Sequence, residues 1–293
     1  MRRWWQAWQL RPMLDYMVTT EQILNPKDGQ IEAKKTGAVE VGRYVPAILQ
    51  QLGQMAKQYP TYPVVTEYFY CGNALYKLSR YEDAISSYDQ ALVIKPDLHE
   101  AWTNRGNALD DLGQQREALV SYDKAIEIKP DDDAAWYSRG IALGNLGQPE
   151  TAIASYDKAI EFKPDDDAAW NNRGTALYDL GQQEEAIASY DKAIEFKPDD
   201  YNAWNNRGIA LSDLGRYKEA LMSFEQALQI QPKYANAHYN KACCYGLQKN
   251  IDLAIATLQQ AISIDSKHRD MAKTDSDFDG IRDNERFQAL IGE

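Results

Sequence analysis

The chain has 293 residues, of which 44% are hydrophobic and 26% charged, and a formal net charge of −12. This composition is that of a globular chain with a buried core, and no run of residues stays apolar over the roughly 18 positions that a membrane span needs. Residues 99–200 hold 10 Lys/Arg against 22 Asp/Glu, which disfavours nucleic acid as a partner because phosphate binding depends on basic side chains.

The first 43 residues are predicted to form a flexible leader and linker. The stretch "MRRWWQAWQLRPML" mixes tryptophan and arginine, a composition that also suits a membrane interface. It lacks the continuous apolar core of a secretory signal, and Pro12 limits any helix in it to a few turns. We therefore expect an unordered leader and a cytoplasmic chain, with weak membrane contact through this segment as the alternative.

Residues 44–64 are predicted to form an N-terminal capping helix. Its stretch "YVPAILQQLGQMAKQY" places Ile48, Leu49, Leu52 and Met55 on one helical face. This segment does not fit the repeat that follows, so we expect it to cover the first repeat.

A repeat of 34 residues dominates the sequence. The stretch "AIASYDKAIEFKPDD" occurs at 152–166 and again, letter for letter, at 186–200. At this period six units follow one another in residues 65–268: 65–98, 99–132, 133–166, 167–200, 201–234 and 235–268. Position 8 of a unit is glycine in five units, positions 20 and 27 are always alanine, position 24 is aromatic in five, and position 32 is proline in five.

These positions describe two antiparallel helices in each unit. The first helix ends where Gly113, Gly147, Gly181 or Gly215 can adopt the left-handed conformation. The second helix carries small and apolar residues at a spacing of three and four, which makes one buried stripe. It ends before proline, which disfavours helix in the residue preceding it. Small residues at positions 8, 20 and 27 allow close approach, and the rings at positions 4 and 24 fill the remaining space.

With these residues the chain closely resembles the tetratricopeptide repeat (TPR) family, and "AWNNRGTALYDLG" is similar to bacterial arrays of it. The resemblance covers residues 65–268. It implies an all-α, right-handed superhelical solenoid of about six helix-turn-helix repeats with N- and C-terminal capping helices and a concave face. The last unit departs from the pattern at His238, Ala242, Leu258 and Ser266, as terminal repeats often do.

The sequence offers little chemistry for catalysis. The three cysteines are Cys71, Cys243 and Cys244, without zinc-site spacing, and the three histidines stand at different unit positions. No nucleophile–histidine arrangement or phosphate loop is present. We therefore predict that the chain is no enzyme and needs no cofactor or metal.

The family presents positions 2, 5, 6, 9, 12 and 13 of each first helix to its concave face. Asparagine recurs at position 6, and one amide can both donate to and accept from an extended peptide backbone. The alternative is that asparagine is only a soluble surface residue. Acids at positions 12 and 13 predict a neutral-to-basic ligand. The candidate groove residues are Asn73, Asn104, Asn107, Asp110, Asp111, Asn171, Asn172, Asp179, Asn205, Asn206, Asp213 and Asn240.

A second row consists of arginines at position 7: Arg105, Arg139, Arg173 and Arg207. They either meet a carboxylate of the ligand or pair with acids of the array, such as Asp123, Asp157 and Asp191. We expect the second arrangement.

The closing segment, residues 269–293, contains "DSDFDGIRDNERFQALI". Asp275, Asp277 and Asp279 match a calcium loop, but Arg286 stands where that loop needs its bidentate glutamate. The alternative is a cap whose acids begin helical turns and whose apolar residues cover the last repeat, and we prefer it. Phe278, Ile281, Phe287, Leu290 and Ile291 would supply its apolar face.

The sequence thus predicts a non-catalytic protein–protein interaction scaffold that binds an extended, neutral-to-basic segment in an Asn/Asp-lined concave groove. Two alternatives stay open: a module that associates with itself, and a scaffold that responds to calcium through residues 275–285.

Overall fold

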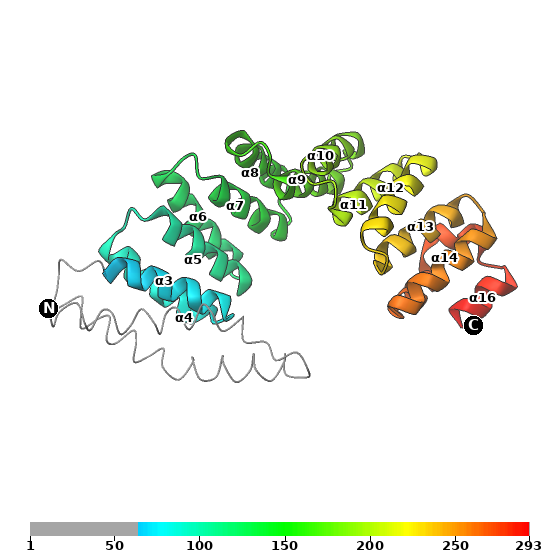
Figure 1. Ribbon diagram of the computed structural model, residues 1–293, viewed down its shortest axis with the longest axis horizontal. Coiled ribbons are helices and arrows are strands. Elements are labelled where there is room, and N and C mark those ends of the chain that lie inside the picture. Colours follow the sequence, from blue (N-terminus) through cyan, green and yellow to red (C-terminus); the bar gives the residue numbers. More distant parts are fainter. Residues whose placement is uncertain (1–63, 293) are drawn as a thin grey trace. The chain divides into compact units, whose positions relative to one another are not determined.

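The computed structural model describes residues 64–292, and all regular structure in them is helical (Figure 1). The predicted leader (1–43) and nearly all of the predicted N-terminal cap (44–64) lie outside the described residues. Within residues 64–292 there is no helix of the length and apolarity that a bilayer crossing requires. The all-α tandem-repeat fold expected from the sequence is confirmed.

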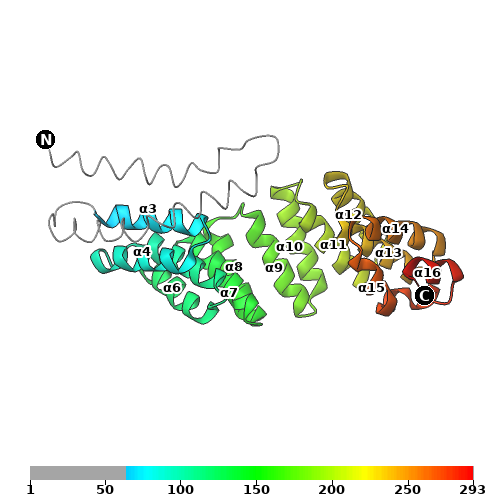
Figure 2. The ribbon, with the colours of Figure 1, turned by 90° about the horizontal axis from the view of Figure 1, so that it is seen from below.

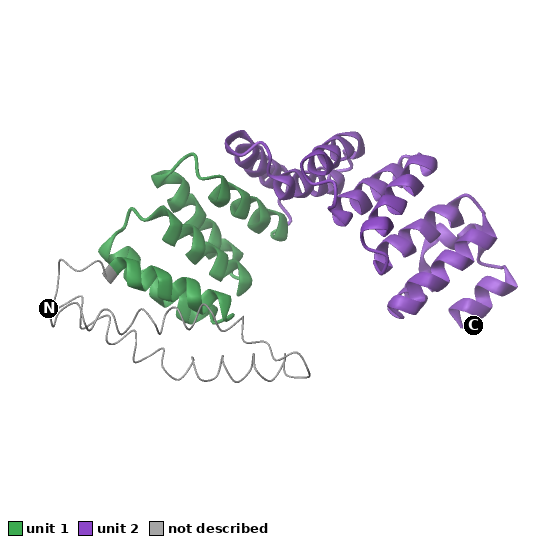
Figure 3. Cartoon of the chain, viewed as in Figure 1, with its two compact units in different colours: residues 1–146 green, residues 147–293 purple. Residues whose placement is uncertain are grey.

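The chain divides into two compact units, residues 1–146 and 147–293 (Figure 3). The boundary falls inside the third predicted repeat, between its two helices. Unit 1 contains α3 (Val64–Lys77), α4 (Tyr81–Ile94), α5 (His99–Asp111), α6 (Gln115–Ile128) and α7 (Asp133–Asn145). Unit 2 contains α8 (Pro149–Phe162), α9 (Asp167–Asp179), α10 (Gln183–Phe196), α11 (Tyr201–Asp213), α12 (Tyr217–Ile230), α13 (Ala235–Leu247), α14 (Ile251–Ile264), α15 (Lys267–Thr274), the 3-10 helix η2 (Ser276–Ile281) and α16 (Glu285–Ile291).

Within each unit, consecutive helices pack as antiparallel pairs, α3 with α4 in unit 1 and α9 with α10 in unit 2 (Figure 2). The turn inside a pair needs one residue in the left-handed conformation. Gly113, Gly181 and Gly215 take φ angles of 77°, 73° and 71° there, as the sequence predicted. In the two outermost pairs, Ser79 and Lys249 occupy the same turn at φ 56°.

The glycine at position 8 is required by the ring at position 24. A Cβ at Gly106 would lie 2.4 Å from the ring of Tyr122, and one at Gly208 would lie 2.5 Å from the ring of Phe224. Both rings are fully buried, so they have no room to yield. The sixth pair has Ala242 in place of the glycine and Leu258 in place of the aromatic ring, so the larger residue at position 8 is matched by a smaller one at position 24.

A ladder of polar contacts joins the first helix of the second to fifth repeats to the repeat before it. Arg207 donates from Nε to Asp191 at 2.6 Å and from a terminal nitrogen to the hydroxyl of Ser223 at 2.7 Å. Its guanidinium lies over the ring of Trp204, 6.0 Å from the centroid. The indole N–H of Trp204 donates to the carbonyl of Pro198 at 3.0 Å. Equivalent ion pairs are Arg105–Asp89, Arg139–Asp123 and Arg173–Asp157. The predicted pairing of the arginines with acids of the array is confirmed.

The closing segment packs onto the last repeat. Phe278, Phe287 and Ile291 are almost completely buried among residues of α13 and α14, and the two phenylalanine rings lie 5.2 Å apart between centroids. The segment comes so close to α13 that a Cβ at Gly246 would lie 2.7 Å from the carbonyl oxygen of Asp277. Gly246 stands at position 12, where the other repeats carry tyrosine, aspartate, serine or, in the third repeat, Gly144. The missing side chain of Gly246 leaves room for the segment.

Candidate functional site

In unit 1, residues at the positions that the family presents to its concave face are linked by hydrogen bonds of their amides. Asn104 Nδ2 donates to Asn73 Oδ1 at 2.9 Å, and the hydroxyl of Tyr88 donates to the same oxygen at 2.8 Å. The hydroxyl of Tyr122 donates to Asn107 Oδ1 at 2.9 Å. The buried rings at position 24 therefore reach through the helix pair with their hydroxyl groups and fix the amides at position 9.

The asparagines of unit 2 are linked in a related way, between positions 6 and 5. Asn206 Nδ2 donates to Asn171 Oδ1 at 3.2 Å, and Asn240 Nδ2 donates to Asn205 Oδ1 at 2.9 Å. Asn205 is only 4% exposed, so it supports its neighbours rather than facing solvent. Asn172 lies partly exposed beside Asn171 on α9. Each of these bonds uses one N–H of an amide that carries two.

A coupling between positions 9 and 24 was not foreseen from the sequence. In the first, second and fourth repeats, position 24 is tyrosine and position 9 is polar, as in the bond from the Tyr190 hydroxyl to Thr175 Oγ1 at 3.4 Å. The third repeat departs from this pattern, with Tyr156 at position 24 and Ile141 at position 9. Where position 24 is Phe224, position 9 is Ile209, so no hydroxyl is left unpaired. The sequence signal for this coupling, two positions 15 residues apart, is only partial because the third repeat does not follow it.

The acids of unit 2 lie at the C-terminal ends of its first helices. Asp179 and Asp213 are exposed, and the hydroxyl of Tyr178 donates to Asp213 Oδ2 at 2.5 Å. Partial burial, and then the hydrogen bond to Asp213, raise the pKa of Tyr178, so the hydroxyl keeps its proton and orients the carboxylate.

In unit 1, Asp111 is exposed and takes the equivalent bond from Tyr76. Asp110 is partly buried and bonds to Asn145, and burial raises its pKa. One of its two carboxylate oxygens is buried without a partner among the described residues.

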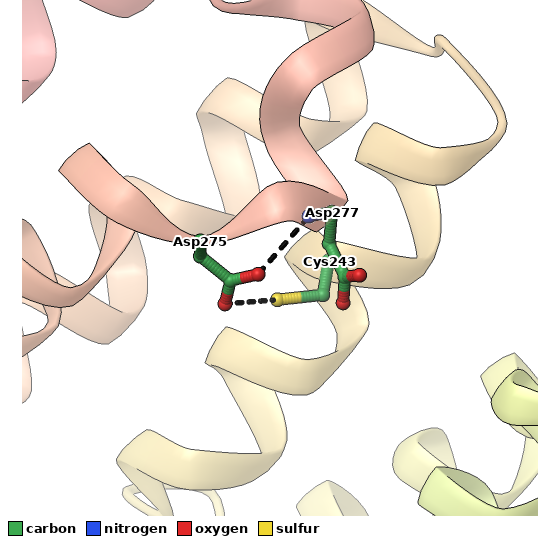
Figure 4. A group of neighbouring side chains, drawn as sticks. All are labelled: Cys243, Asp275 and Asp277. Atoms are coloured by element: carbon green, nitrogen blue, oxygen red, sulfur yellow. Dashed lines mark hydrogen bonds between the residues drawn. The ribbon is translucent and has the colours of Figure 1, made fainter.

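The closing segment adds carboxylates to the last repeat (Figure 4). The hydroxyl of Tyr239 donates to Asp275 Oδ2 at 2.7 Å, the thiol of Cys243 lies 3.7 Å from the same oxygen, and the backbone N–H of Asp277 donates to Asp275 Oδ1 at 3.0 Å. Asp275 thus begins η2 with its side chain, as a capping residue does.

The side chain of Asp277 has a different environment. Its pKa is raised by burial first, and then by the negative charges of Asp275 and Asp213. Asp213 belongs to the first helix of the preceding repeat, so the closing segment brings Asp277 to the acidic end of that helix. Sequence reasoning did not foresee this, because nothing in the repeat relates residue 277 to residue 213.

Ligand atoms of Cys243, Asp275 and Asp277 lie within 4.8 Å of one another, which is close enough for a metal ion. Burial raises the pKa of the Cys243 thiol, and both oxygens of Asp275 already accept hydrogen bonds from the protein. Further along the segment, Asp279 pairs with Arg282, and Arg286 pairs with Asp252 at 2.6 Å. The donor set therefore suits a cap better than a metal site.

In α9, α11 and α13, the positions predicted to face the groove contain no lysine or arginine. The bases of these helices stand at position 7, where each of them pairs with an acid of the preceding second helix. Unit 2 therefore combines oriented amides with the carboxylates of Asp179, Asp213 and Asp277, and the bases of these three helices are paired with other acids.

Comparisons with known proteins agree with this architecture. Family models described as TPR repeat match residues 72–113, 106–147, 145–181 and 174–215, and one described as tetratricopeptide repeat matches residues 199–267. Together they cover more than half of the chain. A search of curated protein sequences finds no match.

Among solved structures, the chain is similar to YrrB, described as a TPR protein with an unusual peptide-binding site, with 26% identity and a TM-score of 0.54 over 62% of this chain and 93% of YrrB. It is similar to MamA with 26% identity and a TM-score of 0.53, over 56% of this chain and 96% of MamA. PilF of Pseudomonas aeruginosa shares the fold, with 14% identity and a TM-score of 0.63 over 71% of this chain and 96% of PilF.

Proposed function

Because the chain belongs to the tetratricopeptide repeat family, we propose that it is a non-catalytic scaffold that holds an extended, neutral-to-basic segment of another protein. One observation carries the proposal: the concave positions of unit 2 offer amides and carboxylates without any lysine or arginine. The peptide-binding site of YrrB, a protein similar in sequence and fold, supports a peptide as the class of ligand.

The amides would hold the backbone of the bound segment. Asn206 and Asn240 each spend one N–H on a neighbouring asparagine, which fixes the orientation of the amide before any ligand arrives. The second N–H and the oxygen can then pair with a peptide carbonyl and N–H at a small cost in side-chain entropy. Such contacts read the backbone and make few demands on the sequence of the ligand.

The carboxylates would select the charge of the ligand. Asp179 and Asp213 are exposed, and Tyr178 orients Asp213, while Asp277 extends the same acidic region from the closing segment. An acidic segment would be repelled here, whereas lysine or arginine side chains would be attracted, most strongly at low salt.

The described residues offer little support for catalysis. Burial raises the pKa of Cys71 to about 11, which keeps this thiol protonated and unreactive at neutral pH. His99 bonds to the buried Asp132, and His268 bonds to Asn236, so both imidazoles hold parts of the array together. We extend the proposal to a cytoplasmic protein without nucleic-acid ligands.

Paired charge variants test the role of the acids. Asp179→Asn with Asp213→Asn removes two concave charges, and Asp165→Asn with Asp199→Asn removes two exposed charges from the turns between repeats. The probe is a fluorescent peptide of alternating lysine and serine, and binding is followed by fluorescence anisotropy at low and high salt. The concave pair should weaken binding about tenfold and flatten its salt dependence, and the turn pair should change it little. Equal effects of the two pairs would refute the site.

The amides are tested with a neutral probe, a peptide of glycine and serine. Replacing Asn172 and Asn206 together by alanine should weaken its binding while the helical circular dichroism stays unchanged. Gln226→Ala with Gln260→Ala is the control, since both glutamines are exposed amides on second helices. Unchanged affinity of the asparagine variant would contradict the role assigned to the amides.

A further inference from the structure

The first repeat has lost the polar contacts that join other repeats to their predecessors. In the fifth repeat, Trp204, Asn206 and Arg207 at positions 4, 6 and 7 bind the preceding repeat through its proline carbonyl, its asparagine and its aspartate. The first repeat carries Tyr68, Tyr70 and Cys71 at these positions. None of the three brings a charge, so this side of α3 suits an apolar neighbour.

This side of α3 is nevertheless shielded from solvent. Tyr68 is 3% exposed and Cys71 is 0% exposed, and burial is the main cause of the raised pKa of both. The hydroxyl of Ser87 donates to the sulfur of Cys71 at 3.9 Å. In later repeats the equivalent serine accepts a hydrogen bond from the arginine at position 7, as Ser223 does from Arg207. Tyr70 is 56% exposed and marks the margin of the shielded surface. The side chains of Tyr68 and Cys71 belong to a core cluster with residues of α4 and α5, such as Tyr88 and Ala101. No described element precedes α3, so any neighbour on the preceding side has to come from outside residues 64–292.

We propose that residues 44–59 of this chain dock on this surface, with Ile48, Leu49, Leu52 and Met55 against Tyr68 and Cys71. These residues lie outside the described part of the chain. The charge fits, because Lys57 is the single charged residue of the stretch and falls opposite the apolar stripe on a helical wheel. The length fits as well, because four residues separate Tyr59 from Val64, and helix–helix connections of two to eight residues join antiparallel neighbours.

The docked segment would occupy the place of a preceding repeat and would close this end of the array. A second copy of the chain could then not stack its last repeat on α3. The proposal does not depend on what the concave face binds.

Reactivity of Cys71 tests the docking in the full-length chain. Native protein is exposed to iodoacetamide, and mass spectrometry of peptides gives the labelling rate at each cysteine. Leu49→Glu with Leu52→Glu disrupts the apolar stripe, and Gln50→Glu with Gln54→Glu places the same charges on the opposite face. The first pair should raise labelling of Cys71 at least about tenfold, because a buried thiol reacts only when its cover opens. The second pair should leave it unchanged.

Cys243 and Cys244 report whether the rest of the array stays folded, since both are buried in unit 2. A selective rise at Cys71 supports the proposal. The proposal would be overturned if Leu49→Glu with Leu52→Glu did not raise the labelling rate of Cys71. It would also be overturned if that variant and the milder Leu52→Ala both raised the labelling rates of all three cysteines equally. Protection of Cys71 that disappears when the wild-type chain is diluted would also overturn it, and would assign the surface to a second copy.

Discussion

Replacing Gly208 by alanine tests the contact on which the helix pairs depend. The new Cβ would lie 2.5, 2.8 and 2.9 Å from three ring carbons of Phe224, distances that side-chain atoms do not tolerate. The ring is fully buried and cannot swing away. Overpacking of this kind costs about 1–3 kcal/mol, while alanine in a helix is favoured over glycine by about 1 kcal/mol. The free energy of unfolding should therefore fall by up to about 2 kcal/mol.

The sixth repeat already contains the compensated pair, Ala242 with Leu258. Gly208→Ala combined with Phe224→Leu should therefore be clearly more stable than the sum of the two single changes predicts. Gly144→Ala is the control, since nothing lies within 4 Å of its added Cβ. It should raise stability by up to about 1 kcal/mol through helix propensity alone.

All four variants are compared by urea unfolding, followed by circular dichroism. If Gly208→Ala were as stable as the wild type while Gly144→Ala gained stability, the predicted steric clash with the ring of Phe224 would be refuted. Strict additivity in the double variant would refute the compensation.

Three further changes test other contacts. Arg207→Met should cost about 1–2 kcal/mol in urea unfolding because it loses an ion pair and a contact over an indole ring; Arg216→Met, which loses only an exposed pair within one helix, should cost nothing measurable. Phe224→Tyr places a hydroxyl beside Ile209, without a partner at position 9, and should lose up to about 3 kcal/mol; Ile209→Thr in the same chain should restore most of it. Asp277→Asn should raise the thermal midpoint at pH 7. Because the pKa of Asp277 is raised in the folded protein, the protonated carboxyl favours folding below the ordinary aspartate pKa, and this advantage is lost as the pH rises through the folded pKa. The gain from Asp277→Asn should therefore vanish at about pH 3.

The repeated part of the architecture could be predicted because each position meets the same neighbours in successive repeats. Once the 34-residue period is known, a glycine at position 8 opposite a ring at position 24 predicts a close helix pair. An arginine at position 7 with an aspartate at position 25 likewise predicts an ion pair between repeats. Gly208 and Arg207 show both rules in the structure.

The candidate site was less predictable because it depends on differences between repeats. Asn104 bonds to position 9 of the preceding repeat, whereas Asn206 bonds to position 5, and the period alone does not choose between these partners. Asn205 was expected at the surface of the groove, but its side chain is buried between neighbours. Asp277 joins the acidic region only because the closing segment leaves the repeat register and crosses α13.

The acids of unit 2 without a basic partner lower the stability of the fold, and no other described contact compensates for this loss. Asp277 is partly buried, and burial followed by the negative charges of Asp275, Asp213 and Asp279 raises its pKa, with no lysine or arginine among the causes. The cations of the closing segment are used elsewhere, since Arg282 binds backbone carbonyls and Asp279, and Arg286 binds Asp252. Residues that are needed for binding commonly reduce the stability of the fold in this way. A basic segment in the groove would supply the missing counter-charge, so its binding should stabilise the wild type more than Asp277→Asn.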